Sequence, residues 1–228
     1  MTAATVDEIL AGRHQFQAWS RSYEDALLFE DYFLDRERYK EELVEVLAGM
    51  IHHGPVLEAS NGYGSIGTRL AQARKCDFLI LCDSEHARGL CEVRRSREQI
   101  PAHRYRILSE IPQKPVFELV YSVNTMHEWN APELILRRLF GCVKPGGGLL
   151  INDLRRDANP FITEYVIREM AADETETGKH HLRTFLSSLQ SAYSPSEVAS
   201  ILESACPGEI SIENDEPMTV TAVVRKRE

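Results

Sequence analysis

The segment that most constrains the fold runs from Val56 to Ala71, where a short apolar run ends in an acid, passes through closely spaced glycines and becomes helical. Glycine lets the main chain approach a ligand and adopt positive φ, and the first turn of a helix presents unpaired N–H groups. This order of strand, glycine-rich turn and helix is typical of cofactor loops, but nucleotide binders of many kinds contain it. The downstream sequence therefore decides the class.

From Gly54 onward, short apolar runs alternate with helical patterns, which indicates a parallel sheet covered by helices. We expect parallel strands at 56–59, 78–82, 105–108, 117–122 and 148–153, and a terminal antiparallel pair at 210–212 and 219–224. We expect one helix at 131–143, begun by Asn130 and closed by a Lys-Pro-Gly-Gly-Gly turn, and another that starts with a capping box formed by Ser194 and Glu197.

The N-terminal part of the chain differs in texture. Residues 6–51 show no strand pattern, and apolar side chains recur there at helical spacing. We therefore divide the 228 residues into a helical cap or lid at 1–51 and a main domain at 52–228. The aromatic residues of the cap either pack on the main domain or cover a substrate, and Trp19 and Tyr23 are the candidates for substrate contact.

Composition excludes several classes of function. A net charge of -9 argues against a nucleic-acid partner, because such surfaces depend on clustered Lys and Arg. The chain contains neither an 18-residue apolar run nor a basic leader followed by an apolar segment, so we expect a cytoplasmic protein without a membrane partner. Five scattered cysteines without a CxxC pair indicate reduced thiols. Two pairs of adjacent histidines occur, at 52–53 and at 180–181, and we expect the second pair to lie in a loop. Neither pair has further His, Cys, Asp or Glu residues at metal-ligand spacing, so we expect no metal.

Asp83 follows the second expected strand, about twenty residues after the glycine-rich loop. An acid at this position can accept hydrogen bonds from both hydroxyls of a ribose. The alternative is an exposed turn residue at the start of the next helix.

The segments FELVYSVNTMHEW at 117–129 and LFGCVKPGGGLLINDLRRD at 139–157 resemble the class I S-adenosylmethionine-dependent methyltransferases. That family shows an apolar strand, an LHEW-type segment, a helix, an LKPGG-type turn and a second apolar strand that ends near an acid. The resemblance covers 56–226. It implies an α/β fold, a Rossmann-like seven-stranded sheet with helices on both faces and a C-terminal antiparallel hairpin, with S-adenosyl-L-methionine across the ends of the first two strands.

The resemblance also implies a set of cofactor-binding residues. The methionine-binding loop would contain Glu58, Ser60, Gly62 and Gly64; Asp83 would hold the ribose, Glu110 would lie near the adenine, and Asn124 would lie beside the methionine part. Ser60 replaces a usual glycine, so either the main chain needs no positive φ there or the loop is displaced. The fourth strand lacks the Asn/Asp-Pro-Pro-Tyr ending of enzymes that methylate base or glutamine amides, which argues against those acceptors.

His127 is the candidate general base, because a histidine near its ordinary pKa can remove a proton from a hydroxyl or ammonium acceptor. The alternative is a histidine that packs and bonds to its own loop. Tyr63 faces the transferred methyl group or covers the cofactor. Arg155 and Arg156 either hold an acidic group of the acceptor or form ion pairs with Asp153 or Asp157.

These features favour methyl transfer to O or N of a small molecule, such as a specialised metabolite. Three alternatives stay open: a peptide or protein methyltransferase, a nicotinamide-dependent dehydrogenase, and a homologue that binds cofactor without turnover. The dehydrogenases share the loop and the ribose acid, but the Lys-Pro-Gly-Gly turn and the terminal hairpin fit them poorly. A homodimer is also left open.

Overall fold

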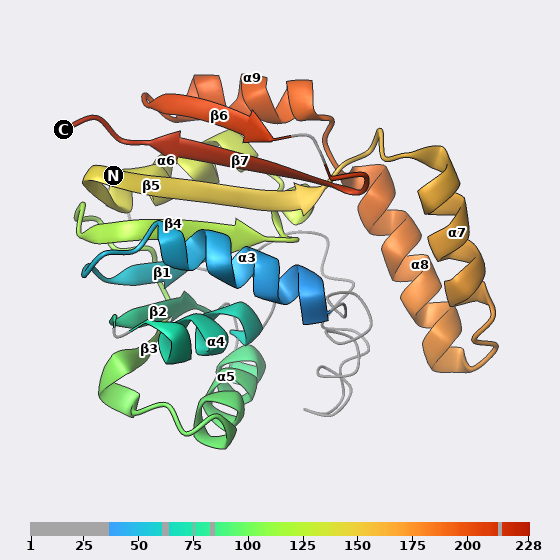
Figure 1. Cartoon of the computed structure of the whole chain (residues 1–228), viewed down its shortest axis with the longest axis horizontal. Helices are drawn as coiled ribbons and strands as arrows, with labels where there is room; N and C mark the ends of the chain where they lie inside the picture. Colours follow the sequence, from blue (N-terminus) through green and yellow to red (C-terminus); the bar gives the residue numbers. More distant parts are fainter. Residues whose placement is uncertain (1–36, 61–63, 75, 83–84, 214–215) are drawn as a thin grey trace.

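Seven strands form one sheet in the order β3-β2-β1-β4-β5-β7-β6 (Figure 1). The computed structural model describes residues 37–60, 64–74, 76–82, 85–213 and 216–228. The strands are β1 (Val56–Glu58), β2 (Phe78–Leu81), β3 (Tyr105–Leu108), β4 (Phe117–Val123), β5 (Val143–Leu154), β6 (Glu209–Glu213) and β7 (Thr219–Arg225). Strands β1 to β5 are parallel, whereas β7 pairs antiparallel with both β5 and β6. The expected seven-stranded sheet with a C-terminal antiparallel hairpin is therefore confirmed.

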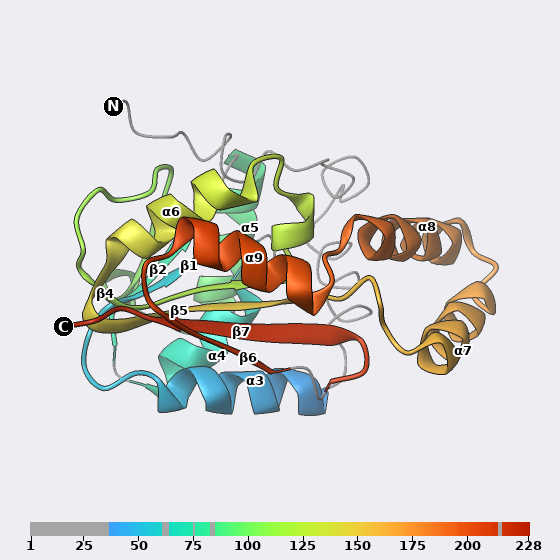
Figure 2. The same cartoon turned by 90° about the horizontal axis from the view of Figure 1, so that it is seen from above.

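Helices cover both faces of the sheet, as expected (Figure 2). One face packs against α3 (Glu37–Gly49), α4 (Ser65–Ala73) and α5 (Glu85–Arg97), and the other against α6 (Pro132–Cys142) and α9 (Pro195–Ala205). Every residue of β4 is buried, because this central strand is covered on both sides. The apolar run that predicted β4 reflects this double coverage.

The predicted helix ends are partly confirmed. Ser194 and Glu197 form the expected capping box at the start of α9. By contrast, α6 begins at Pro132 after Ala131, with no side-chain cap, so the prediction that Asn130 begins this helix is wrong. The helix ends at Cys142, and the glycine turn, in which Gly146 has φ +74°, falls within the residues assigned to β5.

Two further helices, α7 (Pro160–Ala171) and α8 (Glu176–Ser191), form an arm at one end of the sheet (Figures 1 and 2). The Asn159 side chain caps α7, and Thr175 caps α8 by accepting a hydrogen bond from the Gly178 N–H at 3.0 Å. His180 and His181 lie within α8, so the expectation of a loop there is wrong. The arm packs against the domain where α8 meets η2 (Met126–Glu128), a short 3₁₀ helix after β4.

The described part of the N-terminal region is helical, as predicted. Leu43 and Leu47 of α3 are buried in the same core as Val56 of β1. Residues 1–36, which include Trp19 and Tyr23, lie outside the described residues, and the division of the chain at residue 51 stays a prediction.

Three expected absences concern the described residues only. No helix there has both the length and the apolar composition needed to cross a membrane. No cluster of His, Cys, Asp and Glu in the same ranges could hold a metal ion. The five cysteines are buried, and none forms a disulfide in the described part of the chain.

The contact between α4 and the sheet gives a stability prediction. A methyl group at Gly67 would overlap the Phe78 ring, whereas one at Gly89 in α5 would meet no atom within 4 Å. We expect Gly67→Ala to lower the free energy of unfolding by about 1–3 kcal/mol through overpacking. The matched control, Gly89→Ala, should raise it by roughly 0.5–1 kcal/mol, because alanine has the higher helix propensity. Urea denaturation measures both, and a Gly67→Ala protein as stable as the parent would contradict this close packing.

Candidate functional site

The strand order places a topological switch point between β1 and β4. From β1 the chain continues through α4 to β2 on one side, and from β4 it continues through α6 to β5 on the other. The connections that follow β1 and β4 therefore run in opposite directions along the sheet. In open α/β sheets, ligands bind at such a switch point.

Ser60 joins the two strands at the switch point. Beyond the last ladder bond, from the Ala59 N–H to the Tyr121 carbonyl at 2.8 Å, the Val123 N–H donates to Ser60 Oγ at 2.9 Å. Ser60 is buried and is not among the described residues with positive φ. Of the two explanations for a serine in place of glycine, the first applies, because the main chain needs no positive φ here.

Gly64 begins α4 in a conformation that favours glycine. Its φ is +77°, and a Cβ at this position would overlap the Tyr105 hydroxyl. Ser65, the first residue of the helix, has a buried Oγ without a hydrogen-bond partner among the described residues. The start of α4 is therefore a close-packed backbone turn with polar groups left to bond. The predicted loop residues Gly62 and Tyr63 lie outside the described part of the chain.

Glu58, at the end of β1, is a buried carboxylate with partners inside the domain. The Tyr121 hydroxyl donates a hydrogen bond to Glu58 Oε2 at 2.8 Å. Burial and the adjacent charge of Glu58 hold the pKa of Tyr121 well above its ordinary value, so the phenol stays a donor. The same Oε2 lies 2.6 Å from the place where a Cβ of Gly67 would stand. The Glu58 carboxylate therefore lies against the first turn of α4.

Asn124 follows β4 in the left-handed region, with φ +48°. Its N–H donates to the Asn152 carbonyl at 2.8 Å, but its buried Oδ1 has no hydrogen-bond partner among the described residues. A buried acceptor without a donor is costly unless a ligand supplies one. An ammonium group, such as that of a bound amino-acid tail, would satisfy this oxygen. The residues present at the switch point thus fit the cofactor that the sequence resemblance implies.

The most distinctive polar pair of the site joins His127 of η2 to Asp153 near the end of β5. His127 Nδ1 lies 2.6 Å from Asp153 Oδ1, and the His127 N–H donates to Asp153 Oδ2 at 3.0 Å. The Leu154 N–H also donates to Oδ1, at 2.7 Å. This carboxylate therefore fixes both the position of the imidazole and the tautomer that carries a proton on Nδ1.

The environment of His127 makes it a stronger base than an ordinary histidine. Burial alone lowers its pKa, but the charge of Asp153 and their hydrogen bond raise it, and the charge of Glu128 adds to this, so the pKa of His127 is raised overall. The second ring nitrogen, Nε2, accepts no hydrogen bond from any described residue and lies 3.9 Å from Glu128 Oε1. The imidazole thus keeps one buried nitrogen that forms no hydrogen bond with the described residues.

His127 was predicted from the sequence, but its partner Asp153 was not. Asp153 was considered only as a possible ion-pair partner of the arginines. The pair could have been predicted from the positions of the two residues, because His127 follows one apolar strand and Asp153 ends the next. Neighbouring parallel strands bring such residues together at one edge of the sheet.

Arg155 and Arg156 both form ion pairs. Arg155 makes a two-point contact with Asp157, with Nε 2.8 Å from Oδ1 and Nη2 3.0 Å from Oδ2. Arg156 contacts Glu197 at the start of α9 and donates to the Ala192 carbonyl at 3.2 Å. An acidic acceptor group would have to compete with these carboxylates.

Two predicted cofactor contacts complete the comparison with the sequence. Glu110 is exposed, two residues beyond the end of β3. Asp83, the predicted ribose ligand, lies outside the described residues, immediately after Cys82 at the end of β2.

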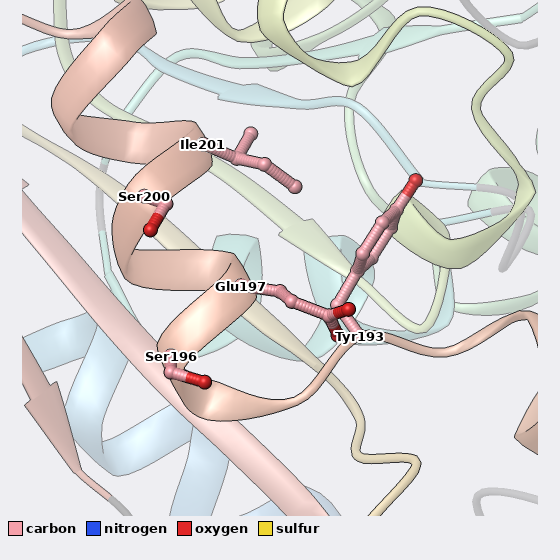
Figure 3. A pocket seen from close by; sticks show the side chains of 5 residues that line it. All are labelled: Tyr193, Ser196, Glu197, Ser200 and Ile201. Carbon is pink, nitrogen blue, oxygen red and sulfur yellow. The ribbon is translucent and has the colours of Figure 1, made fainter.

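A hollow of about 390 Å³ lies beside α9 (Figure 3). It is lined by Tyr193, Ser196, Glu197, Ser200 and Ile201, and the figure shows Ile201 extending from the helix toward the Tyr193 ring. Burial raises the pKa of Tyr193, and the charges of Glu133 and Asp153 raise it further. Tyr193 forms an isolated β-bridge with Arg155, two residues after Asp153, so the hollow lies beyond the end of β5, at the same edge of the sheet as the His127–Asp153 pair.

Solved structures place this architecture in a known fold. A SAM-dependent methyltransferase from Aquifex aeolicus superposes with a TM-score of 0.62 at 16% identity, covering 90% of this chain and 98% of its own. Phosphoethanolamine N-methyltransferase 2 of Haemonchus contortus, in complex with S-adenosyl-L-methionine, gives 0.69 at 10% identity, covering 95% of this chain and 60% of its own. The chain has the class I methyltransferase fold.

The methyltransferase fold also carries other chemistry. The cyclase SpnF superposes with a TM-score of 0.56 at 11% identity, covering 82% of this chain and 81% of its own. No protein-family model and no curated protein sequence matches the chain. The function must therefore be argued from the site.

Proposed function

We propose that this protein transfers the methyl group of S-adenosyl-L-methionine to an oxygen or nitrogen atom of a small molecule. The observation that carries the proposal is the His127–Asp153 pair, a buried imidazole with an oriented Nδ1 and an available Nε2 at the functional edge of a methyltransferase fold. A fold and a cofactor loop alone would also suit a protein that only binds the cofactor. Methyl transfer to a hydroxyl or ammonium group also needs a general base, which binding alone does not, and His127 oriented by Asp153 can serve as that base.

Residues at the switch point would hold the cofactor. The first turn of α4 offers main-chain N–H groups from Ser65 onward, and Asn124 Oδ1 offers an acceptor for the ammonium of the amino-acid tail. Gly62, Tyr63 and Asp83 are proposed contacts from the sequence. When bound, the cofactor supplies a methyl group already activated by the positive sulfonium sulfur.

The chain itself orients the acceptor and moves its proton. His127 Nε2 accepts the proton of a hydroxyl or ammonium group, while the Nδ1 proton stays bonded to Asp153. The imidazolium formed is stabilised by the Asp153 carboxylate and by the nearby Glu128. This pair would contribute about 10²–10⁴-fold to the rate, as general bases commonly do.

The acceptor that we favour is a specialised small metabolite. The net charge of -9 gives no support to a nucleic-acid acceptor, because such surfaces depend on clustered Lys and Arg. A cytoplasmic location is proposed with it. Methylation of a peptide or protein, and cofactor binding without turnover, are the alternatives.

An untargeted transfer assay tests the proposal. The full chain is incubated with S-adenosyl-L-methionine carrying a trideuteromethyl group and with separate extracts of small metabolites and of peptides, and products are sought by mass spectrometry. We expect labelled products from the metabolite extract, formed about 10²–10⁴-fold more slowly by the His127→Ala protein. Label only in the peptide extract would change the substrate class, and label in neither would favour a binding protein.

A further inference from the structure

Ser60 occupies a position at which the resemblance leads one to expect glycine, and its hydroxyl forms the hydrogen bond that crosses the switch point. Main-chain pairing between β1 and β4 ends with the bond from the Ala59 N–H to the Tyr121 carbonyl. One step further, the Val123 N–H donates to Ser60 Oγ at 2.9 Å. A glycine would leave this N–H without that acceptor. The serine therefore extends the contact between the two strands by one residue.

The residue that follows Val123 is Asn124, with φ +48° and an unpartnered buried Oδ1. Left-handed geometry persists in a non-glycine residue only when its surroundings enforce it. Here two hydrogen bonds, one to the residue before Asn124 and one to Asn124 itself, hold the main chain in this conformation. Ser60 holds the preceding N–H, and the Asn152 carbonyl accepts the N–H of Asn124 itself at 2.8 Å. Asn152 is in turn bonded through Nδ2 to Thr221 Oγ1 of β7 at 2.8 Å.

We propose that Ser60 is a positioning residue that fixes Asn124 in the orientation needed to bind the ammonium of the cofactor's amino-acid tail. The inference rests on the proposed function, because it assumes that this tail occupies the switch point. It assigns Ser60 no direct contact with the cofactor. Its effect is transmitted through the Val123 N–H to the next residue, so it should change recognition of the tail and leave recognition of the nucleoside unaltered.

Two ligands that differ in the tail test this inference. S-Adenosylhomocysteine carries the amino-acid tail, whereas 5′-methylthioadenosine retains the nucleoside and sulfur without it. We expect calorimetry to show that Ser60→Ala and Ser60→Gly each weaken S-adenosylhomocysteine binding by about 10-fold, the scale of one hydrogen bond. Binding of 5′-methylthioadenosine should change by less than about twofold, within the precision of such comparisons.

Ser122→Ala is the matched control. Ser122 lies in β4 one residue before Val123, is fully buried, and has an Oγ without a partner among the described residues. Its removal deletes the same atom without breaking the Ser60 contact, so affinity for both ligands should remain at the parent level. Amide exchange at Val123 gives a readout without ligand, and it should be faster in both Ser60 variants than in Ser122→Ala.

The outcomes separate this inference from the proposed function. Equal weakening of both ligands, or unchanged S-adenosylhomocysteine affinity, in folded Ser60 variants would overturn the positioning role while leaving the proposed function intact. A parent protein that binds neither ligand would instead overturn the proposed function, and the role of Ser60 with it.

Discussion

Replacing His127 with alanine is expected to lower the rate of methyl transfer by about 10²–10⁴-fold. The variant loses the only described imidazole that has an oriented Nδ1 and an available Nε2 at this edge of the sheet. The affinity for S-adenosylhomocysteine should stay close to that of the parent, because the proposed cofactor contacts come from other residues. Single-turnover rates with a labelled acceptor, together with calorimetry, measure the two effects separately.

A second histidine supplies the control. His103 is exposed in η1 (Ala102–Arg104), before the amino end of β3 and therefore at the opposite edge of the sheet. His103→Ala should transfer at the parent rate. For a hydroxyl acceptor, the His127→Ala rate should recover as the pH rises, since the acceptor then loses its proton without help. A His127→Ala protein with the full rate at neutral pH would reduce this imidazole to a structural part of its loop.

Asp153→Asn is expected to lower transfer by about 10²–10⁴-fold while keeping the size of the side chain, because the amide no longer enforces the Nδ1 tautomer or stabilises the imidazolium. The variant should also shift the pH profile. In the parent the rate rises as His127 loses its proton, with a midpoint above the ordinary histidine pKa of about 6.5. Without the carboxylate, burial lowers the pKa of His127, and the midpoint should move to lower pH.

The same pair links stability to pH. Because the pKa of His127 is raised in the folded state, the stabilisation from its protonation is fully present below the unfolded pKa of about 6.5 and is lost as the pH rises through the folded value. The loss of stability in Asp153→Asn should therefore be larger at acid pH than at alkaline pH. Urea denaturation at several pH values measures this, and an equal loss at every pH would show that His127 is not the titrating partner of Asp153.

Much of the fold could be predicted because its signals are local. The apolar runs around Leu57, Leu79 and Val120 belong to strands that are buried on both faces, so hydrophobicity alone reveals them. The capping box at Ser194 is likewise a four-residue pattern. The glycine-rich turn and the Lys-Pro-Gly-Gly turn add the positions at which the chain changes direction.

The parts that were missed depend on weaker or more distant relations. Asn159 and Thr175 are residue types that commonly cap helices, so the starts of α7 and α8 could have been predicted. Few residues of these two helices are buried, however, so their apolar pattern is weak, and the paired histidines of α8 suggested a polar loop. The His127–Asp153 pair needs two residues far apart in the chain, which meet only because β4 and β5 are neighbours. The role of Ser60 depends on a main-chain donor in another strand, which no local pattern indicates.

Calorimetric titration of the full chain with S-adenosylhomocysteine tests most directly whether the switch point binds S-adenosyl-L-methionine. NAD, the cofactor of the dehydrogenase alternative, is the control ligand. We expect a dissociation constant in the micromolar range, which corresponds to a binding free energy of about −8 kcal/mol, and no heat of binding for NAD. The Gly64→Val protein should lose this affinity, because the start of α4 requires φ +77° and leaves no room beside Tyr105. Binding of NAD in place of S-adenosylhomocysteine, or of neither by the folded parent protein, would contradict the assignment of this site.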